Sequence, residues 1–118
     1  MITLELPFPP STNTIWRNVN GRTLLSRRGR EFRREVGLHV GMQHKGEPLE
    51  GRLSVLVLLT PPDRRKRDID NYGGKAVLDA LTHAGVWLDD EQVDELIIQR
   101  GEIRKGGGCV VRIRELAA

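Results

Sequence analysis

An uninterrupted apolar run in the middle of the chain sets the strongest limit on the fold. The run is LSVLVLLT, residues 53–60, and two prolines follow it directly. Eight residues is the length of a strand rather than of a helix, and an apolar run without polar alternation is typical of a strand buried on both faces. We therefore predict a central strand over 53–60, covered on both faces by the rest of the chain.

Two amphipathic segments predict helices on either side of that strand. Over 26–43, Phe32 and Val36 have helical spacing, followed less regularly by Leu38, Val40 and Met42, and Ser26 is a suitable N-cap. Over 75–84 the apolar residues form one stripe, and Gly85 stands where a left-handed C-terminal cap is expected. Both helices should pack their apolar side against the sheet.

Three other segments predict strands, and together the elements predict the fold class. ITLEL (2–6) alternates apolar and polar residues, PFPP ends it, and a loop follows up to residue 25. QVDELIIQRGEI (92–103) and GCVVRIREL (108–116) indicate two strands joined by a flexible hairpin connection, RKGGG, with Cys109 as a small core residue. The economical packing is α+β, a two-layer sandwich of a mixed β-sheet with two main helices on one face.

Size and composition limit what this fold can contain. At 118 residues the chain is expected to be a single domain, 1–118, and its aromatic content of 4% implies a modest core of the kind that often gains stability by pairing. One cysteine excludes an intrachain disulfide, and no stretch resembles a signal peptide or a membrane span. We expect a cytoplasmic protein without membrane contact.

Charge is distributed unevenly along the chain. Residues 1–67 contain 13 Lys and Arg against 6 Asp and Glu, whereas residues 68–118 contain 6 against 10, giving +7 and −4. Lys and Arg that neutralise phosphates supply most sequence-independent affinity for nucleic acid, so the first part is expected to attract a polyanion. Its segment SRRGREFRREV (26–36) is equally well interpreted as the solvated face of a helix.

Carboxylates stand at both ends of the predicted helix 75–84. Asp68 and Asp70 precede it, and Asp89 and Asp90 follow it. In an extended segment alternate side chains point the same way, so Asp68 and Asp70 are expected to project together while Ile69 faces the core. A ten-residue helix is about 15 Å long, and GVWLDD is long enough to return Asp90 to the first pair.

Such a gathering of carboxylates predicts a metal site. Carboxylates without partners repel one another, and a divalent cation removes the repulsion. Oxygen-only ligands with open positions suit Mg2+, or Mn2+ in its place, which keep several waters and accept phosphate oxygens. Beside a basic tract that holds nucleic acid, this chemistry is that of a metal-dependent nuclease. The alternative is a branched-DNA-binding protein without chemistry of its own, although acids without metal would weaken its hold on phosphate.

Two structural alternatives apply to the same residues. DIDNYGGKAVLD (68–79) partly matches a calcium-binding loop, but Tyr72 stands at the fifth place, Asp79 rather than Glu at the twelfth, and no entering helix precedes it. WLDDEQ (87–92) taken alone is typical of a solvated turn. Asp79 and His83 share the polar face of the predicted helix with Lys75, where we expect ordinary surface charges.

Taken together, the motifs resemble one family. PPSTNTIWR, PDRRKRDIDN, KAVLDALTHAGVWLDDEQV and a closing glycine-rich hairpin occur in this order. The chain is similar, over nearly its whole length, to the RusA family of Holliday junction resolvases of prophages and bacteria. The resemblance implies a homodimer that acts on the nucleoid, binds four-way or other branched DNA, and makes paired symmetric nicks that depend on magnesium.

The resemblance also implies roles for individual residues. Asp68, Asp70 and Asp90 match the family's catalytic, metal-holding aspartates, Asp89 matches an adjacent acid, and Lys75 matches a functional lysine. One departure is that three residues, YGG, separate Asn71 from Lys75 where the family usually has two, and the glycines are expected to absorb the extra residue. The expected DNA contacts are Arg64, Arg65, Lys66, Arg67, Arg17, Arg27 and Arg28.

Overall fold

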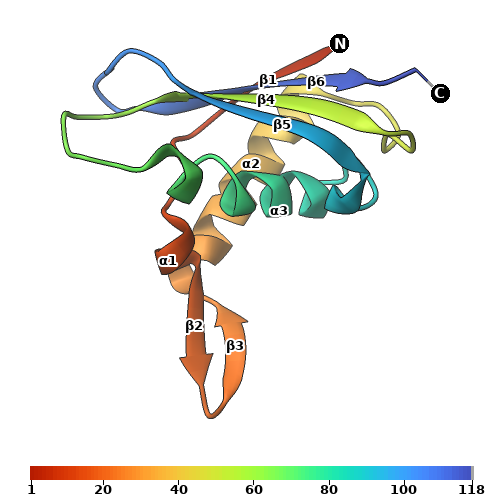
Figure 1. Ribbon diagram of the computed structural model, residues 1–118. Coiled ribbons are helices and arrows are strands. Elements are labelled where there is room, and N and C mark those ends of the chain that lie inside the picture. Colours follow the sequence, from red (N-terminus) through yellow and green to blue (C-terminus); the bar gives the residue numbers. More distant parts are fainter. Residues whose placement is uncertain (118) are drawn as a thin grey trace.

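A mixed four-stranded sheet forms one layer of the molecule, whose computed structural model describes residues 1–117. The strand order is β1-β6-β4-β5, with β1 at Ile2–Leu6, β6 at Gly108–Glu115, β4 at Leu53–Thr60 and β5 at Val93–Arg100. Helices α2 (Arg27–Gln43) and α3 (Lys75–His83) form the second layer, on one face of the sheet (Figure 1). The predicted α+β class, with two main helices on one face, is confirmed.

Strand β4 is central, as its apolar sequence predicts. It pairs antiparallel with β6 and parallel with β5, and its residues Val55 and Val57 are fully buried under the helices. The prediction that both faces are covered is wrong. Leu56 and Leu58 point to the face that carries no helix and are only half-buried. Since the strand lies between two others, its apolar run reflects a central position in the sheet rather than a third layer.

The predicted hairpin between the last two strands is also wrong. Both strands exist, but β4 lies between them, so the connection 101–107 crosses the carboxyl end of β4. Hydrogen bonds from Gly101 N to Leu59 O and from Arg104 N to Pro61 O, the latter 2.9 Å long, fasten this crossing. The glycines therefore do not form a tight hairpin turn. They lie where the chain turns back into β6, and Gly106 and Gly107 adopt φ of +87° and +66°.

The first predicted helix is confirmed, and its cap with it. The Ser26 hydroxyl accepts a 3.1 Å hydrogen bond from the amide of Gly29, which satisfies one of the free donors at the start of α2. Phe32, Val36 and Val40, each four residues apart, are buried against the sheet. Helix α2 therefore presents one regular apolar stripe, and the less regular Leu38 and Met42 are exposed.

The end of α3 sends the chain back toward the beginning of that helix. Gly85 has the predicted left-handed conformation, with φ of +82°, and donates to Thr82 O while Val86 N donates to Leu81 O. Beyond this cap the indole of Trp87 is buried, and its Nε1 donates to the hydroxyl of Thr82 at 2.6 Å. Residues 86–92 are thus fixed along α3.

Residues 7–25, predicted as a loop, contain regular structure. A short helix α1 (Thr12–Ile15) leads into an antiparallel pair, β2 (Trp16–Val19) and β3 (Arg22–Leu25), which forms a separate sheet. The two turn residues are Asn20 and Gly21, with φ of +52° and +76°, and Asn-Gly is the pair that a two-residue hairpin favours. In Figure 1 this hairpin extends away from the body of the molecule. Across residues 1–117, no helix combines the length and the apolar character needed to cross a bilayer.

Candidate active site and nucleic-acid interface

The acidic pair that precedes α3 lies on a tight turn. Residues Ile69–Asn71 form a single turn of 3₁₀ helix, η1, with Asp68 at its N-cap and Asp70 within it. The prediction of an extended segment is therefore wrong, because Asn71 N donates to Asp68 O and Tyr72 N to Ile69 O. Ile69 is half-buried against the core, as expected, and the side chains of both aspartates are exposed.

Two contacts fix this turn to the rest of the molecule. Gly73 packs so closely on the side chain of Ile98 in β5 that a Cβ atom at this position would clash. On the other side, the Thr12 hydroxyl of α1 donates a 3.1 Å hydrogen bond to the carbonyl oxygen of Asn71. The turn that carries Asp70 is thus held between the sheet and the N-terminal segment.

The second acidic group returns to the same end of α3, as the length of the connection predicts. Asp90 Oδ2 lies 3.9 Å from the Nζ atom of Lys75, the first residue of α3. Gly74 adopts an irregular conformation, with φ of −105° and ψ of −97°, immediately before the helix. The backbone is therefore irregular just before α3 begins, and the Lys75 ammonium points toward Asp90.

A buried glutamine, which sequence reasoning missed, holds Asp89 and Asp90 in place. Residues Asp90–Gln92 form a second 3₁₀ turn, η2, closed by a capping box between Asp89 and Gln92, and Asp89 Oδ1 also accepts from Glu91 N at 3.0 Å. Gln92 Oε1 accepts from the amides of Leu88 and Asp89, and its Nε2 donates to the carbonyls of Leu49 and Gly51, all at 2.9 Å. The capping-box spacing, Asp followed by Gln three residues later, was the available signal.

The carboxylates of the site suit a hard divalent cation, but they do not surround a single point. Asp68, Asp70 and Asp90 offer carboxylate oxygens, the ligands that magnesium prefers, and Asp68 and Asp70 use their side chains in no hydrogen bond or ion pair within residues 1–117. In the same part of the chain, no three His, Cys, Asp or Glu side chains are grouped closely enough to hold a metal ion. Asp90 lies at the start of α3, Asp68 and Asp70 lie on the turn that precedes this helix, and Asp89 uses its carboxylate in the capping box.

Two interpretations of α3 change with the structure. A calcium-binding loop over 68–79 is not supported, because strand β4 rather than an entering helix precedes it. Asp79 is no ordinary surface charge. Its Oδ2 lies 2.9 Å from Nη2 of Arg33 in α2, with each side chain less than one-third exposed, so that this pair joins the two helices.

Arg67 lies inside the loop that carries the aspartates, not on its surface. Its side chain is 11% exposed, its Nη1 lies 3.0 Å from Asp63 Oδ1, and its guanidinium lies 5.3 Å and 5.8 Å from the ring centres of Phe8 and Tyr72. This hydrogen bond holds the pKa of the Asp63 carboxyl below its usual value. Arg67, directly before Asp68, thereby anchors the loop to the N-terminal segment.

A basic cleft runs beside this anchor. It has a volume of about 330 Å³ and lies between residues 8–14 and the loop 62–72, with Arg28 from α2 and Arg65 and Arg67 from the loop in its walls. Phe8 and Tyr72 add aromatic rings, whose centres are 5.5 Å apart. Interleaved arginines and aromatic rings are the elements with which proteins bind phosphates and bases, so this cleft is the candidate nucleic-acid interface.

The remaining predicted DNA contacts lie outside the walls of this cleft. Arg64 and Lys66 are exposed and line a neighbouring hollow of about 160 Å³. Arg27, at the start of α2, pairs with Glu31 at 3.0 Å, and Arg17 is exposed on β2. Their contact with DNA stays a prediction.

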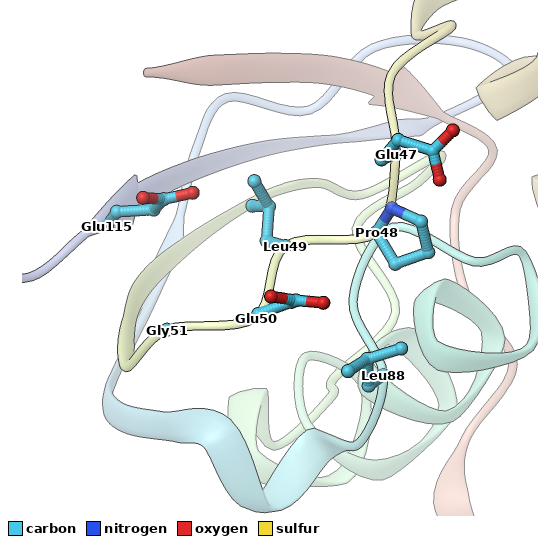
Figure 2. A pocket seen from close by; sticks show the side chains of 7 residues that line it. All are labelled: Glu47, Pro48, Leu49, Glu50, Gly51, Leu88 and Glu115. Atoms are coloured by element: carbon cyan, nitrogen blue, oxygen red, sulfur yellow. The ribbon is translucent and has the colours of Figure 1, made fainter.

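A larger hollow, of about 660 Å³, is lined by residues 47–51, Leu88 and Glu115, and its charge is opposite to that of the cleft. Figure 2 shows the carboxylates of Glu47, Glu50 and Glu115 around it, with Leu88 at one side. Acidic walls repel phosphate, so this hollow is unsuited to nucleic acid.

Comparison with known proteins agrees with the motifs. A family model described as Endodeoxyribonuclease RusA matches residues 7–114. The chain is 38% identical to the crossover junction endodeoxyribonuclease of Enterobacteria phage HK97 over 94% of this chain and 92% of the relative, and 39% identical to that of phage 82 over 96% and 93%. It is 37% identical to that of Escherichia coli K12 over 96% and 93%. The chain therefore belongs to the RusA family of endodeoxyribonucleases.

Proposed function

We propose that this protein is a magnesium-dependent endonuclease that resolves four-way DNA junctions in the cytoplasm of a bacterium, encoded by the bacterium or by a phage. Relatives that match nearly the whole chain carry the name crossover junction endodeoxyribonuclease. The observation that carries the proposal is the meeting of Asp90 with Lys75 beside the turn that bears Asp68 and Asp70. An acidic group and a cation at one helix start, next to a basic cleft, suit phosphodiester cleavage.

Each part of the site has a separate task in this proposal. Asp68, Asp70 and Asp90 would hold magnesium, with manganese as a substitute and Asp89 nearby on the capped turn. Once bound, the ion supplies Lewis-acid charge and a more acidic water. Lys75 approaches the phosphate undergoing attack and offsets the negative charge that develops on its oxygens. Arg28 and Arg65 bind neighbouring phosphates in the cleft, which orients the scissile bond.

Resolution by paired symmetric nicks requires two such sites. One chain has one set of these aspartates, and a four-way junction has approximate two-fold symmetry, so we propose that a homodimer presents one site to each of two strands. The helix-free face of the sheet is the surface for pairing. Leu56, Leu58, Ile97 and Val110 adjoin one another there, and Glu5, Glu95, Arg112 and Arg114 surround them with charges of both signs. A two-fold related copy would bury the apolar row and set opposite charges together.

The proposal is tested by incubating the protein with a synthetic four-way junction, a Y-structure and a linear duplex in magnesium, and by mapping every nick. Junction resolvase activity gives nicks at symmetric positions in two strands of like polarity. Nicks in all three substrates would indicate a general branched-DNA nuclease. Binding to the junction with intact strands in both magnesium and manganese would support the non-catalytic DNA-binding alternative instead.

A further inference from the structure

The β2–β3 hairpin has features that the proposed chemistry does not use. It forms its own two-stranded sheet, pairs with no strand of the main sheet, and extends beyond the N-terminal end of α2 (Figure 1). A two-stranded hairpin is marginally stable by itself, so the packing at its base matters. Trp16 and Leu25 are partly buried there, and Ser26 N donates to Ile15 O at 2.7 Å. The base is fixed and the rest of the hairpin is exposed.

The tip of the hairpin is preorganised. Asn20 and Gly21 both have positive φ, the geometry that matches the natural twist of a two-residue hairpin. Behind the turn, the Thr23 hydroxyl donates to Asn18 Oδ1 at 3.0 Å across the strands. Such a ribbon keeps its shape before binding and so loses little conformational entropy on contact with a partner.

One face of the ribbon is basic. The strand register sets Arg17 opposite Leu24 and Arg22 opposite Val19, so these four side chains share a face. Both arginines are exposed and, within residues 1–117, form no ion pair and no side-chain hydrogen bond. Residues 6–30 contain five arginines and no Asp or Glu. Nothing acidic in this segment competes with a phosphate for these guanidinium groups.

The hairpin is also connected to the candidate active site. Helix α1, directly before β2, supplies Thr14 to the wall of the basic cleft, and its Thr12 bonds to Asn71 of the turn that carries Asp70. On the other side, β3 leads through Ser26 into Arg28 of the same cleft. A molecule held in the cleft could continue along the hairpin without leaving basic surface.

We propose that the β2–β3 hairpin is an arm that enters a groove of one duplex arm of branched DNA, with Arg17 and Arg22 on its phosphates, away from the bond that is cut. The major groove is about 12 Å wide and admits a two-stranded ribbon. Four residues per strand give a reach of about 13 Å, enough to enter the groove. This inference rests on the proposed junction substrate and adds a contact that supplies affinity rather than chemistry.

The test compares two double variants that lose the same charge. Arg17→Gln with Arg22→Gln removes the arm's cations, and Arg34→Gln with Lys45→Gln removes two exposed cations on and just after α2. Binding of the four-way junction is measured without divalent metal over a series of salt concentrations. For the arm variant we expect weaker binding and a slope of log affinity against log salt that is shallower by about 2, one for each lost phosphate contact. The control should keep the slope of the unaltered protein.

Two further readouts make the result decisive. Cleavage at limiting protein should fall in step with binding in the arm variant, because both arginines hold the DNA, whereas its thermal unfolding should match that of the unaltered protein. A slope equal to that of the control would overturn the inference, and so would a lower sedimenting mass, which would make the hairpin a contact between subunits. If the unaltered protein itself fails to bind a junction, the proposed function fails rather than the arm alone.

Discussion

At the scale of single residues, the contacts of a side chain decide its role more than its type does. Arg67 is basic and follows three other basic residues, yet its guanidinium is enclosed by Asp63, Phe8 and Tyr72. Its exposed neighbours Arg64 and Lys66 have no such enclosure. The four residues of one basic tract therefore divide into an internal anchor and a solvent-facing surface.

Cys109 gives a prediction at this scale. Burial raises the pKa of its thiol to about 12, and its side chain is 2% exposed on β6. Since the thiolate is the reactive form, Cys109 should not react with a thiol reagent at pH 8 while the protein is folded, and should react fully in denaturant. The rate of modification, followed by mass spectrometry, measures this. Rapid reaction of the folded protein would show that β6 is not buried as described.

Asp63 and Arg67 give a second residue-scale prediction. Because the pKa of Asp63 is lowered in the folded protein, this ion pair stabilises the fold fully above the usual pKa of a free aspartate, about 3.9, and the contribution is lost as pH falls through the lowered value. Asp63→Asn should therefore be less stable than the unaltered protein at pH 6, and the difference should vanish in strong acid. Urea unfolding over a pH series measures it, with Glu47→Gln as the matched control. An equal difference at all pH values would contradict the ion pair.

At the scale of elements, periodicity predicted most of what the structure shows. The bounds of β1 and β4 match the expected segments, and both long helices occur with the expected caps. Two features of the fold were not predicted. The hairpin over 16–25 contains too few apolar residues to indicate strands, although its Asn-Gly turn was visible. The position of β4 between the last two strands depends on the order of the strands in the sheet, which local sequence does not encode.

The candidate site follows the same division between local and long-range information. The return of Asp90 to the start of α3 could be predicted, because the length of α3 and its glycine cap fix where the chain goes, but there Asp90 contacts Lys75, and it forms no close group with Asp68 and Asp70 within residues 1–117. The 3₁₀ turn at Asp68–Asn71 could not, because it depends on Gly73 packing against Ile98, more than twenty residues away in sequence. Long-range packing, rather than the motif itself, sets the directions of these carboxylates.

Gln92 provides the element-scale prediction. Gln92→Ala leaves two backbone amides and two carbonyls without their partner, and a hydrogen bond contributes about 0.5–1.5 kcal/mol, so the free energy of unfolding should fall by about 2 kcal/mol or more. Because the capped turn carries Asp90, junction cleavage should slow as well. Urea unfolding and cleavage rates are measured beside Glu102→Ala, an exposed side chain just after β5. Equal stability of the two variants would contradict the role of Gln92.

At the scale of the whole molecule, helices α2 and α3 cover one face of the sheet, and the other face carries no helix (Figure 1). The helices bury the side that contains Val55 and Val111, whereas Ile97 on the other side is 42% exposed. The chain also exposes apolar residues on α2, where Leu38 is 59% exposed. Both surfaces are candidates for pairing, and the sheet face is favoured by its row of adjoining apolar side chains and its charges of both signs.

Sedimentation of two variants tests the proposed dimer and which surface would form it. Ile97→Glu should yield a monomer at micromolar concentration, because two charged residues would face each other across the symmetric interface. Leu38→Glu, the matched change on α2, should leave a dimer. Both positions are exposed, so neither change should disturb the fold. A monomer only in the Leu38 variant would move the interface to α2, and a monomeric unaltered protein that still makes paired cuts would remove the need for a dimer.

The central claim is that the exposed carboxylates at the start of α3 perform metal-dependent cleavage, and Asp70→Asn tests it most directly. Binding and cleavage of a four-way junction are measured in magnesium for the unaltered protein, for Asp70→Asn and for Glu50→Gln, which loses one charge in the acidic hollow. Asp70→Asn should bind the junction as tightly or more tightly, since one phosphate-repelling charge is gone, and should leave the DNA uncut. Glu50→Gln should cut normally. Cleavage by Asp70→Asn at the unaltered rate would contradict the assignment of the site.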